Sequence, residues 1–168
     1  MKKVLIIVGI IAVVAIVFFA IPMNMKVDRA VTINADRALV YNNVSKFEIF
    51  EQWSPWAQMD PSQEVTVTGE DGQVGAKMAW VSESDEVGSG SQEITKATQD
   101  RIEMNLEFTA PWQSKSLVYY DFSGEDGNVT VNWGYEGEGN LLTKLMVEGM
   151  LGENYEQGLT DLKKMCEQ

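Results

Sequence analysis

The chain has 168 residues, of which 45% are hydrophobic and 23% are charged, and its formal net charge is −12. This length accommodates one globular domain and a short additional segment. The excess of acidic side chains repels the phosphates of nucleic acids, which excludes nucleic-acid binding on electrostatic grounds. Histidine is absent and cysteine occurs once. Ser-His-Asp and Cys-His catalysis, histidine-bearing zinc sites and a disulfide within the chain are therefore also excluded.

The first segment of the chain is apolar. Residues 4–21, VLIIVGIIAVVAIVFFAI, form an uncharged run that spans roughly 27 Å as a helix, about the thickness of a hydrocarbon core. Lys2 and Lys3 precede it, so we expect a cytoplasmic N-terminus and a domain on the extracytoplasmic, periplasmic side. A cleavable signal peptide is the alternative, but its apolar core is usually shorter and ends in a small-x-small site. Residues 1–24 are therefore predicted to be an uncleaved, single-pass membrane anchor.

The next elements are a strand and two short helices. Residues 25–33 alternate between apolar and polar side chains, which predicts a strand. Asn34 is a suitable N-cap for a helix that begins near Asp36. A second helix is expected over residues 48–53 and should end at Ser54, because the residue before a proline is disfavoured in a helix. The WSPW segment at this point is predicted to be a turn that precedes the next strand.

The second half of the chain is predicted to be strands followed by a long helix. Six segments alternate or are rich in β-forming residues: 64–68, 76–82, 91–97, 101–108, 114–123 and 128–137. Turn sequences separate them, and GEDG occurs twice, at residues 69–72 and 124–127, which is typical of hairpins. Residues 141–167 have helical periodicity, with a break expected near Gly152.

This order predicts an α+β fold in which a seven-stranded antiparallel sheet wraps around a long C-terminal helix. Two short helices follow the first strand, and one N-terminal transmembrane helix is added. The first strand should pair with the last, since otherwise both would be exposed edges. The predicted domain organisation is an anchor in residues 1–24 and a single domain in residues 25–168.

Several stretches of this domain resemble a known family. They are VDRAVTINADRALVYNNVSKFEIFEQWSPW, DP, TGEDGQVGAKMAW, GSGSQEIT and GENYEQGLTDLKKMCE. They are similar to the polyketide cyclase/dehydrase and lipid-transport group of the START-like (SRPBCC) superfamily. The resemblance covers nearly all of residues 25–168 and implies the helix-grip fold, in which a hydrophobic cavity lies between the sheet and the last helix.

The inward faces of the predicted strands are aromatic and rich in methionine. Alternation alone leaves open whether these side chains form a plain core or an adaptable apolar pocket. The resemblance implies that they line a cavity, with the WSPW tryptophans at one end. The predicted ligand-pocket residues are Trp53, Trp56, Met78, Trp80, Met104, Phe108, Tyr120, Phe122, Trp133, Tyr135, Met146, Met150 and Leu159.

These features favour binding or transport of a hydrophobic small molecule or lipid by a membrane-anchored domain. A protein-interaction or stress-response module without a ligand, and a cyclase- or dehydratase-like enzyme, are the alternatives. No catalytic residue, cofactor or metal is predicted. Tyr120 and Tyr135 are the best ionisable candidates on the inward face, but tyrosine in such a position is more often a packing residue. The expected partners are the apolar ligand and the membrane that the N-terminal helix enters.

Overall fold

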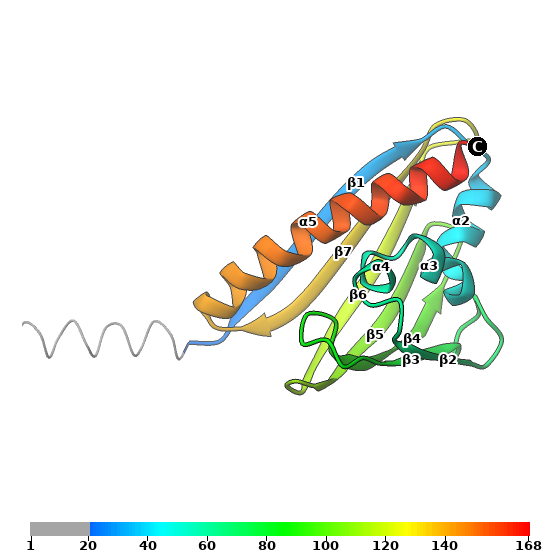
Figure 1. Ribbon diagram of the computed structural model, residues 1–168. Helices are drawn as coiled ribbons and strands as arrows, with labels where there is room; N and C mark the ends of the chain where they lie inside the picture. Colours follow the sequence, from blue (N-terminus) through cyan, green and yellow to red (C-terminus); the bar gives the residue numbers. More distant parts are fainter. Residues whose placement is uncertain (1–20) are drawn as a thin grey trace, which may run out of the picture.

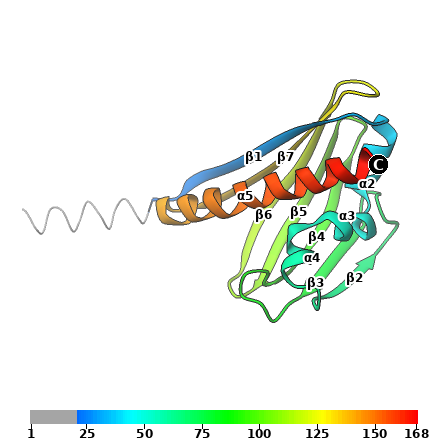
Figure 2. The ribbon, with the colours of Figure 1, turned by 45° about the horizontal axis from the view of Figure 1, so that its top comes forward.

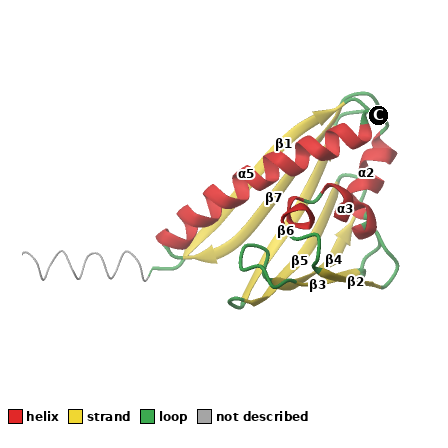
Figure 3. Cartoon of the chain, in the orientation of Figure 1, coloured by secondary structure: helices red, strands yellow, loops and turns green. Residues whose placement is uncertain are grey.

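The computed structural model describes residues 21–168, which form a curved sheet with helices on its concave face (Figures 1 and 3). The predicted anchor lies almost entirely in residues 1–20, outside the described residues. Within residues 21–168, no helix has both the length and the hydropathy that crossing a bilayer requires. The first strand starts at Met23, so regular structure begins two residues before the predicted domain boundary.

The sheet has seven antiparallel strands in the order β1-β7-β6-β5-β4-β3-β2. The strands are β1 (Met23–Ile33), β2 (Glu64–Thr68), β3 (Lys77–Val81), β4 (Ser89–Ala97), β5 (Arg101–Ala110), β6 (Ser114–Ser123) and β7 (Val129–Gly139). The predicted pairing of the first and last strands is confirmed, because β1 runs antiparallel to β7 from Met23 opposite Gly139 to Ile33 opposite Val129. This pairing leaves β2 as one edge of the sheet and places β1 at the other.

Three short helices follow β1, where the sequence predicted two: α2 (Arg37–Ser45), α3 (Phe47–Trp53) and α4 (Pro55–Met59). The WSPW segment is therefore not a simple turn. Ser54 is extended, with φ −63° and ψ 127°, and its Oγ accepts a hydrogen bond from the backbone N–H of Ala57. Pro55 then occupies the first turn of α4, where its fixed φ and missing N–H suit a helix start. The proline ends one helix and begins the next.

The last helix, α5 (Leu141–Cys166), is continuous over 26 residues, so the predicted break near Gly152 is wrong. The glycines of α5 permit close packing. A Cβ on Gly152 would lie 2.5 Å from the guanidinium of Arg29, and one on Gly158 would lie 2.8 Å from the Trp133 ring. Arg29 also forms an ion pair with Glu156 at 2.6 Å. Glycine therefore brings α5 against β1 and β7 without interrupting the helix.

The two GEDG sequences are turns, as predicted, and they have the same geometry. Their four glycines, Gly69, Gly72, Gly124 and Gly127, have φ between 80° and 84°. In each turn the aspartate caps a helix elsewhere in the chain. Asp71 accepts hydrogen bonds from the first two backbone N–H groups of α3, at 2.8 and 3.2 Å. Asp126 accepts one from the N–H of Arg37 at the start of α2, at 2.8 Å. The capping role was not apparent from the sequence.

We expect Asp71→Ala and Asp126→Ala each to lower the free energy of unfolding by about 1 kcal/mol, because each leaves helix N–H groups without an acceptor. Urea unfolding followed by circular dichroism measures the effect. Glu70→Ala and Glu125→Ala, in the same turns, are matched controls and should leave the urea midpoint unchanged. An equal fall in the free energy of unfolding of the glutamate variants would show that the composition of the turn, not capping of the helix, causes the destabilisation.

Candidate functional site

Trp133 lies on the concave face, on β7 next to the edge strand β1, between the sheet and α5. It comes from β7 and is 2% exposed. Its indole stacks on Tyr155 of α5 with ring centroids 4.0 Å apart and an interplanar angle of 11°. On another side it stacks on Tyr120 of β6, at 5.2 Å and 28°. The ring of Trp133 therefore links the gripped helix to β6.

The two tryptophans of the WSPW segment complete this arrangement. Trp53, at the end of α3, and Trp56, in α4, meet the Trp133 ring edge-on, with centroids 5.4 and 5.7 Å away. Phe50 meets it in the same way at 6.1 Å. The Nε1 of Trp53 donates to the carbonyl of Asn43 at 3.0 Å, which fixes its ring. We call Phe50, Trp53, Trp56, Tyr120, Trp133 and Tyr155 the aromatic cluster.

Polar groups inside this cluster are few and uncharged. Within residues 21–168, Nε1 of Trp133 is the one buried side-chain nitrogen or oxygen without a hydrogen-bond partner. Burial raises the pKa of the Tyr120 hydroxyl, and the nearby Tyr155 raises it further. Burial likewise raises the pKa of Tyr155. Both hydroxyls are therefore neutral at physiological pH and can donate or accept hydrogen bonds, but they are not bases.

The remaining predicted pocket residues of the sheet lie around the cluster. Trp80 of β3 packs edge-on against Phe108 of β5, with centroids 5.6 Å apart. Gly90 of β4 allows this position, because a Cβ there would lie 2.9 Å from the Trp80 ring. Met78, Met104, Phe122 and Tyr135 are also buried on this side of the sheet. The hydroxyl of Tyr135 accepts a hydrogen bond from Ser116 at 2.8 Å.

The three predicted pocket residues on α5 do not share one face of the helix. Leu159 is buried, whereas Met146 and Met150 are 61% and 52% exposed. The helical periodicity of residues 141–167 therefore combined apolar residues from two faces of the helix. Met146 precedes the buried Tyr155 by nine residues, and Met150 precedes Leu159 by the same interval. At about 100° per residue, that interval places each pair on opposite sides of the helix. Met146 and Met150 do not enclose the interior.

Tyr155 and Phe50 belong to the aromatic cluster but were not among the predicted pocket residues. Tyr155 is spaced from Leu159 and Leu162 by four and seven residues, the period of one buried helix face. That spacing could have identified it. Phe50 carried no comparable signal, because α3 is too short for a clear period.

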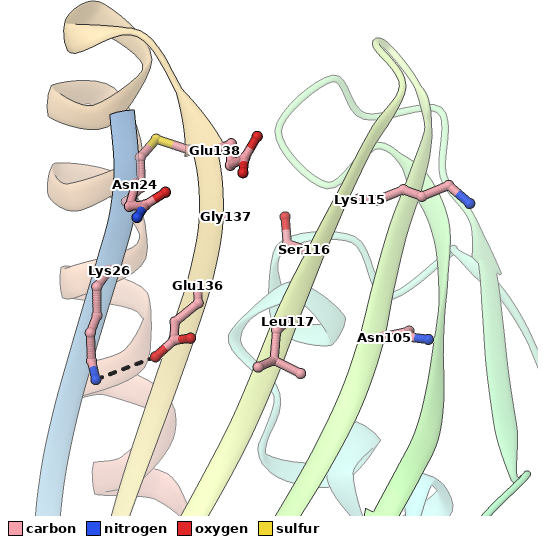
Figure 4. Close-up of a pocket in the computed structure, with 10 residues that line it drawn as sticks. Asn24, Lys26, Asn105, Lys115, Ser116, Leu117, Glu136, Gly137 and Glu138 are labelled. Atoms are coloured by element: carbon pink, nitrogen blue, oxygen red, sulfur yellow. Dashed lines mark ion pairs between the residues drawn. The ribbon is translucent and has the colours of Figure 1, made fainter. Parts of the chain in front are cut away.

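Two hollows open elsewhere on the surface. The first, of about 710 Å³, lies where β6 and β7 diverge (Figure 4). These strands pair only from Leu117 opposite Glu136 onward, so beyond that point Ser116 and Gly137 face each other across a cleft. The second hollow, of about 650 Å³, lies beside α2 at Arg37 and Tyr41.

Neither hollow is lined by a predicted pocket residue, so the assignment of the ligand pocket stays a prediction. In the described part of the chain, no three His, Cys, Asp or Glu side chains gather in a way that could hold a metal ion. The concave face presents mainly aromatic and aliphatic side chains with scattered hydroxyl and indole groups, and one ion pair, between Arg29 and Glu156, where β1 meets α5. Such a surface suits contact with an apolar molecule.

A seven-stranded antiparallel sheet that grips one long helix, with an aromatic interior, defines a helix-grip α+β protein. Residues 24–167 match the family described as polyketide cyclase / dehydrase and lipid transport. The chain belongs to that family. No curated protein matches the chain.

Solved structures share the fold at low sequence identity. An uncharacterized protein from Rhizobium leguminosarum has a TM-score of 0.67 and 14% identity, over 88% of this chain and 97% of that one. The Aha1 dimer from Colwellia psychrerythraea has a TM-score of 0.62 and 14% identity, over 85% and 96%. DynU16, from the dynemicin biosynthetic locus, has a TM-score of 0.58 and 14% identity, over 83% and 46%. At these identities the likeness concerns the fold alone.

Proposed function

We propose that this chain is a membrane-anchored protein that binds or carries an apolar small molecule or lipid between the sheet and α5. The observation that carries the proposal is the aromatic cluster around Trp133, an apolar surface with an unpaired N–H, in a family whose description includes lipid transport. A ligand with one hydrogen-bond acceptor would satisfy the N–H of Trp133, and its apolar part would pack against the aromatic rings.

Binding is favoured over catalysis by the ionisable groups on this face. The buried Tyr120 and Tyr155 have raised pKa values, so neither supplies a base near neutral pH. The hydroxyl of Tyr135 is engaged by Ser116. These groups can orient a polar end of a ligand by hydrogen bonds.

The aromatic cluster is closely packed, so a ligand gains access to it by displacing side chains. Leu106 and Phe108, near the end of β5, are only partly buried and pack against the core. They offer apolar surface next to Trp80, through which the interior can be reached. Tyr155 and Leu159 on α5 are the contacts that a ligand would exchange for its own.

The domain alone, residues 22–168, should bind an apolar fluorescent probe with roughly micromolar affinity, because burial of a few apolar groups offsets the cost of ordering the probe. Trp80→Ala should weaken binding, whereas Trp112→Ala, at a 67% exposed position, is the control and should not. Native mass spectrometry of the full chain should show a co-purifying apolar molecule. Absence of both probe binding and a co-purifying molecule would favour a protein-interaction module without a ligand.

The topology is tested separately. If residues 4–21 cross the membrane with Lys2 and Lys3 in the cytoplasm, a reporter that works only in the cytoplasm should be inactive when fused after Gln168. A reporter that works only outside the cytoplasm should be active in the same position. An active cytoplasmic reporter would overturn the proposed orientation.

A further inference from the structure

The outward face of α5 changes character along the helix. Near its start the face is apolar and exposed: Leu142, Leu145, Met146 and Met150 have exposed fractions of 54%, 61%, 61% and 52%. We call these four residues the apolar stripe. Farther along, the same face carries the exposed residues Glu153, Gln157, Thr160 and Lys164. A helix that covers a sheet normally turns polar side chains outward along its whole length, so the apolar stripe needs a partner.

The apolar stripe lies where the chain emerges from the N-terminal apolar segment. Met23 pairs with Gly139, and α5 begins two residues later at Leu141. Figures 1 and 2 both show the start of β1 beside the start of α5. Only Pro22 separates Ile21, the last residue of the apolar segment, from β1. At 1.5 Å per residue, Leu142 to Met150 extends only about 12 Å along the helix from this point.

We propose that the apolar stripe of α5 rests on the lipid bilayer that residues 4–21 enter, an inference that depends on the proposed membrane anchoring. The single-residue connection holds the start of α5 at the bilayer surface, so lipid is the apolar phase nearest to these side chains. Leucine and methionine side chains can enter the interface to a depth of about 5–10 Å, as in other amphipathic helices that lie on membranes.

The charge of the domain favours a zwitterionic lipid surface. All 25 acidic residues and 11 of the 13 basic ones lie after residue 24, which gives this part of the chain a net charge of −14. An anionic bilayer would repel it. Apolar insertion of the stripe, not attraction between charges, would therefore hold the domain against the membrane.

Docking in this orientation also places the cleft between β6 and β7 close to the bilayer. One wall of the cleft is the end of β7, Glu136 to Glu138, which pairs with β1 at its start. The cleft (Figure 4) therefore lies at the end of the domain where β1 and α5 begin (Figure 1). The lining of the cleft is mostly polar and charged, and includes Lys26, Lys115 and Glu136.

The test uses the full chain in phosphatidylcholine vesicles, with Cys166 replaced by serine so that one introduced cysteine carries a polarity-sensitive fluorophore. Met146→Cys places the label in the apolar stripe. Thr160→Cys places it on the same helix face beyond the stripe and is the matched control. Phosphatidylcholine that carries a spin label in the acyl chain quenches a nearby fluorophore. We expect it to quench most of the emission of the label at 146 and little of the emission of the label at 160.

Vesicle flotation distinguishes membrane anchoring of the chain from docking of α5 on the bilayer. If the chain floats with vesicles and both labels escape quenching, anchoring stands and docking of α5 is overturned. A blue-shifted but unquenched label at 146 also overturns it, because protein, either residues 4–20 or a second copy, then covers the stripe. Failure of the chain to float would overturn both the anchoring and the docking.

Discussion

Replacement of Trp133 by alanine should lower the free energy of unfolding by roughly 3 to 5 kcal/mol, the range for removal of a large aromatic side chain from a filled core. The ring is 2% exposed and contacts five other aromatic rings from α3, α4, α5 and β6. Its removal leaves a cavity between elements that cannot all close inward together. Urea unfolding followed by circular dichroism gives the free energy directly.

Trp112→Ala is the matched control for Trp133→Ala. Its ring is 67% exposed, so the change should stay within about 0.5 kcal/mol of zero. A loss of only about 1 to 2 kcal/mol in Trp133→Ala would mean that the ring lines a space instead of filling one. Probe binding by the same variant then decides whether that space holds the ligand.

The second large effect is expected at Gly158 of α5. A Cβ at this position would lie 2.8 Å from the Trp133 ring and 3.1 Å from the Pro55 ring at the start of α4. Gly158→Ala should therefore lower the free energy of unfolding by about 1 to 3 kcal/mol, the typical cost of overpacking. Because α5 would move away from Trp133, probe binding should change as well.

Gly149→Ala is the natural control, since it lies in the same helix and a Cβ there would have no neighbour within 4 Å. Alanine is favoured over glycine in a helix, so this variant should gain up to about 1 kcal/mol. Both substitutions replace glycine with alanine, but we expect Gly158→Ala to lower the free energy of unfolding and Gly149→Ala to raise it. Equal destabilisation in both would show that the close approach of α5 to Trp133 is not required for stability.

The aromatic cluster gives the sequence WSPW a structural role that bears on the proposed function. Trp53 and Trp56 come from two different short helices, and the Ser54-Pro55 junction between them turns both rings toward Trp133. A movement of α4 or α5 would therefore open the cluster. These are the elements that must yield if a ligand is to reach Trp133.

Local sequence patterns determined most of the architecture. Period-two alternation or richness in β-forming residues predicted each strand of the sheet, with the bounds of β6 matching at both ends, Ser114 and Ser123. Side-chain alternation is a property of a single strand, so it can be read without knowledge of its neighbours. The pairing of β1 with β7 also followed from the order of elements, because otherwise the sheet would expose two further edges.

Contacts between residues far apart in the sequence determined the features that local patterns did not predict. Nothing local to Tyr119 indicates that its ring is buried on the outer face of the sheet, over Gly134 and with the Arg101 guanidinium 4.2 Å from its centroid. The capping of α3 by Asp71 likewise joins groups that the chain order separates.

The same holds for the helix that the sheet grips. Composition marked α5 as apolar, but only its packing against Arg29 and Trp133 decided which side faces the sheet. That packing buries Tyr155 and Leu159 and leaves Met146 and Met150 exposed. A sequence pattern reports which residues are apolar and with what period. Which apolar face is buried depends on the partner surface, and that surface exists only once the chain has folded.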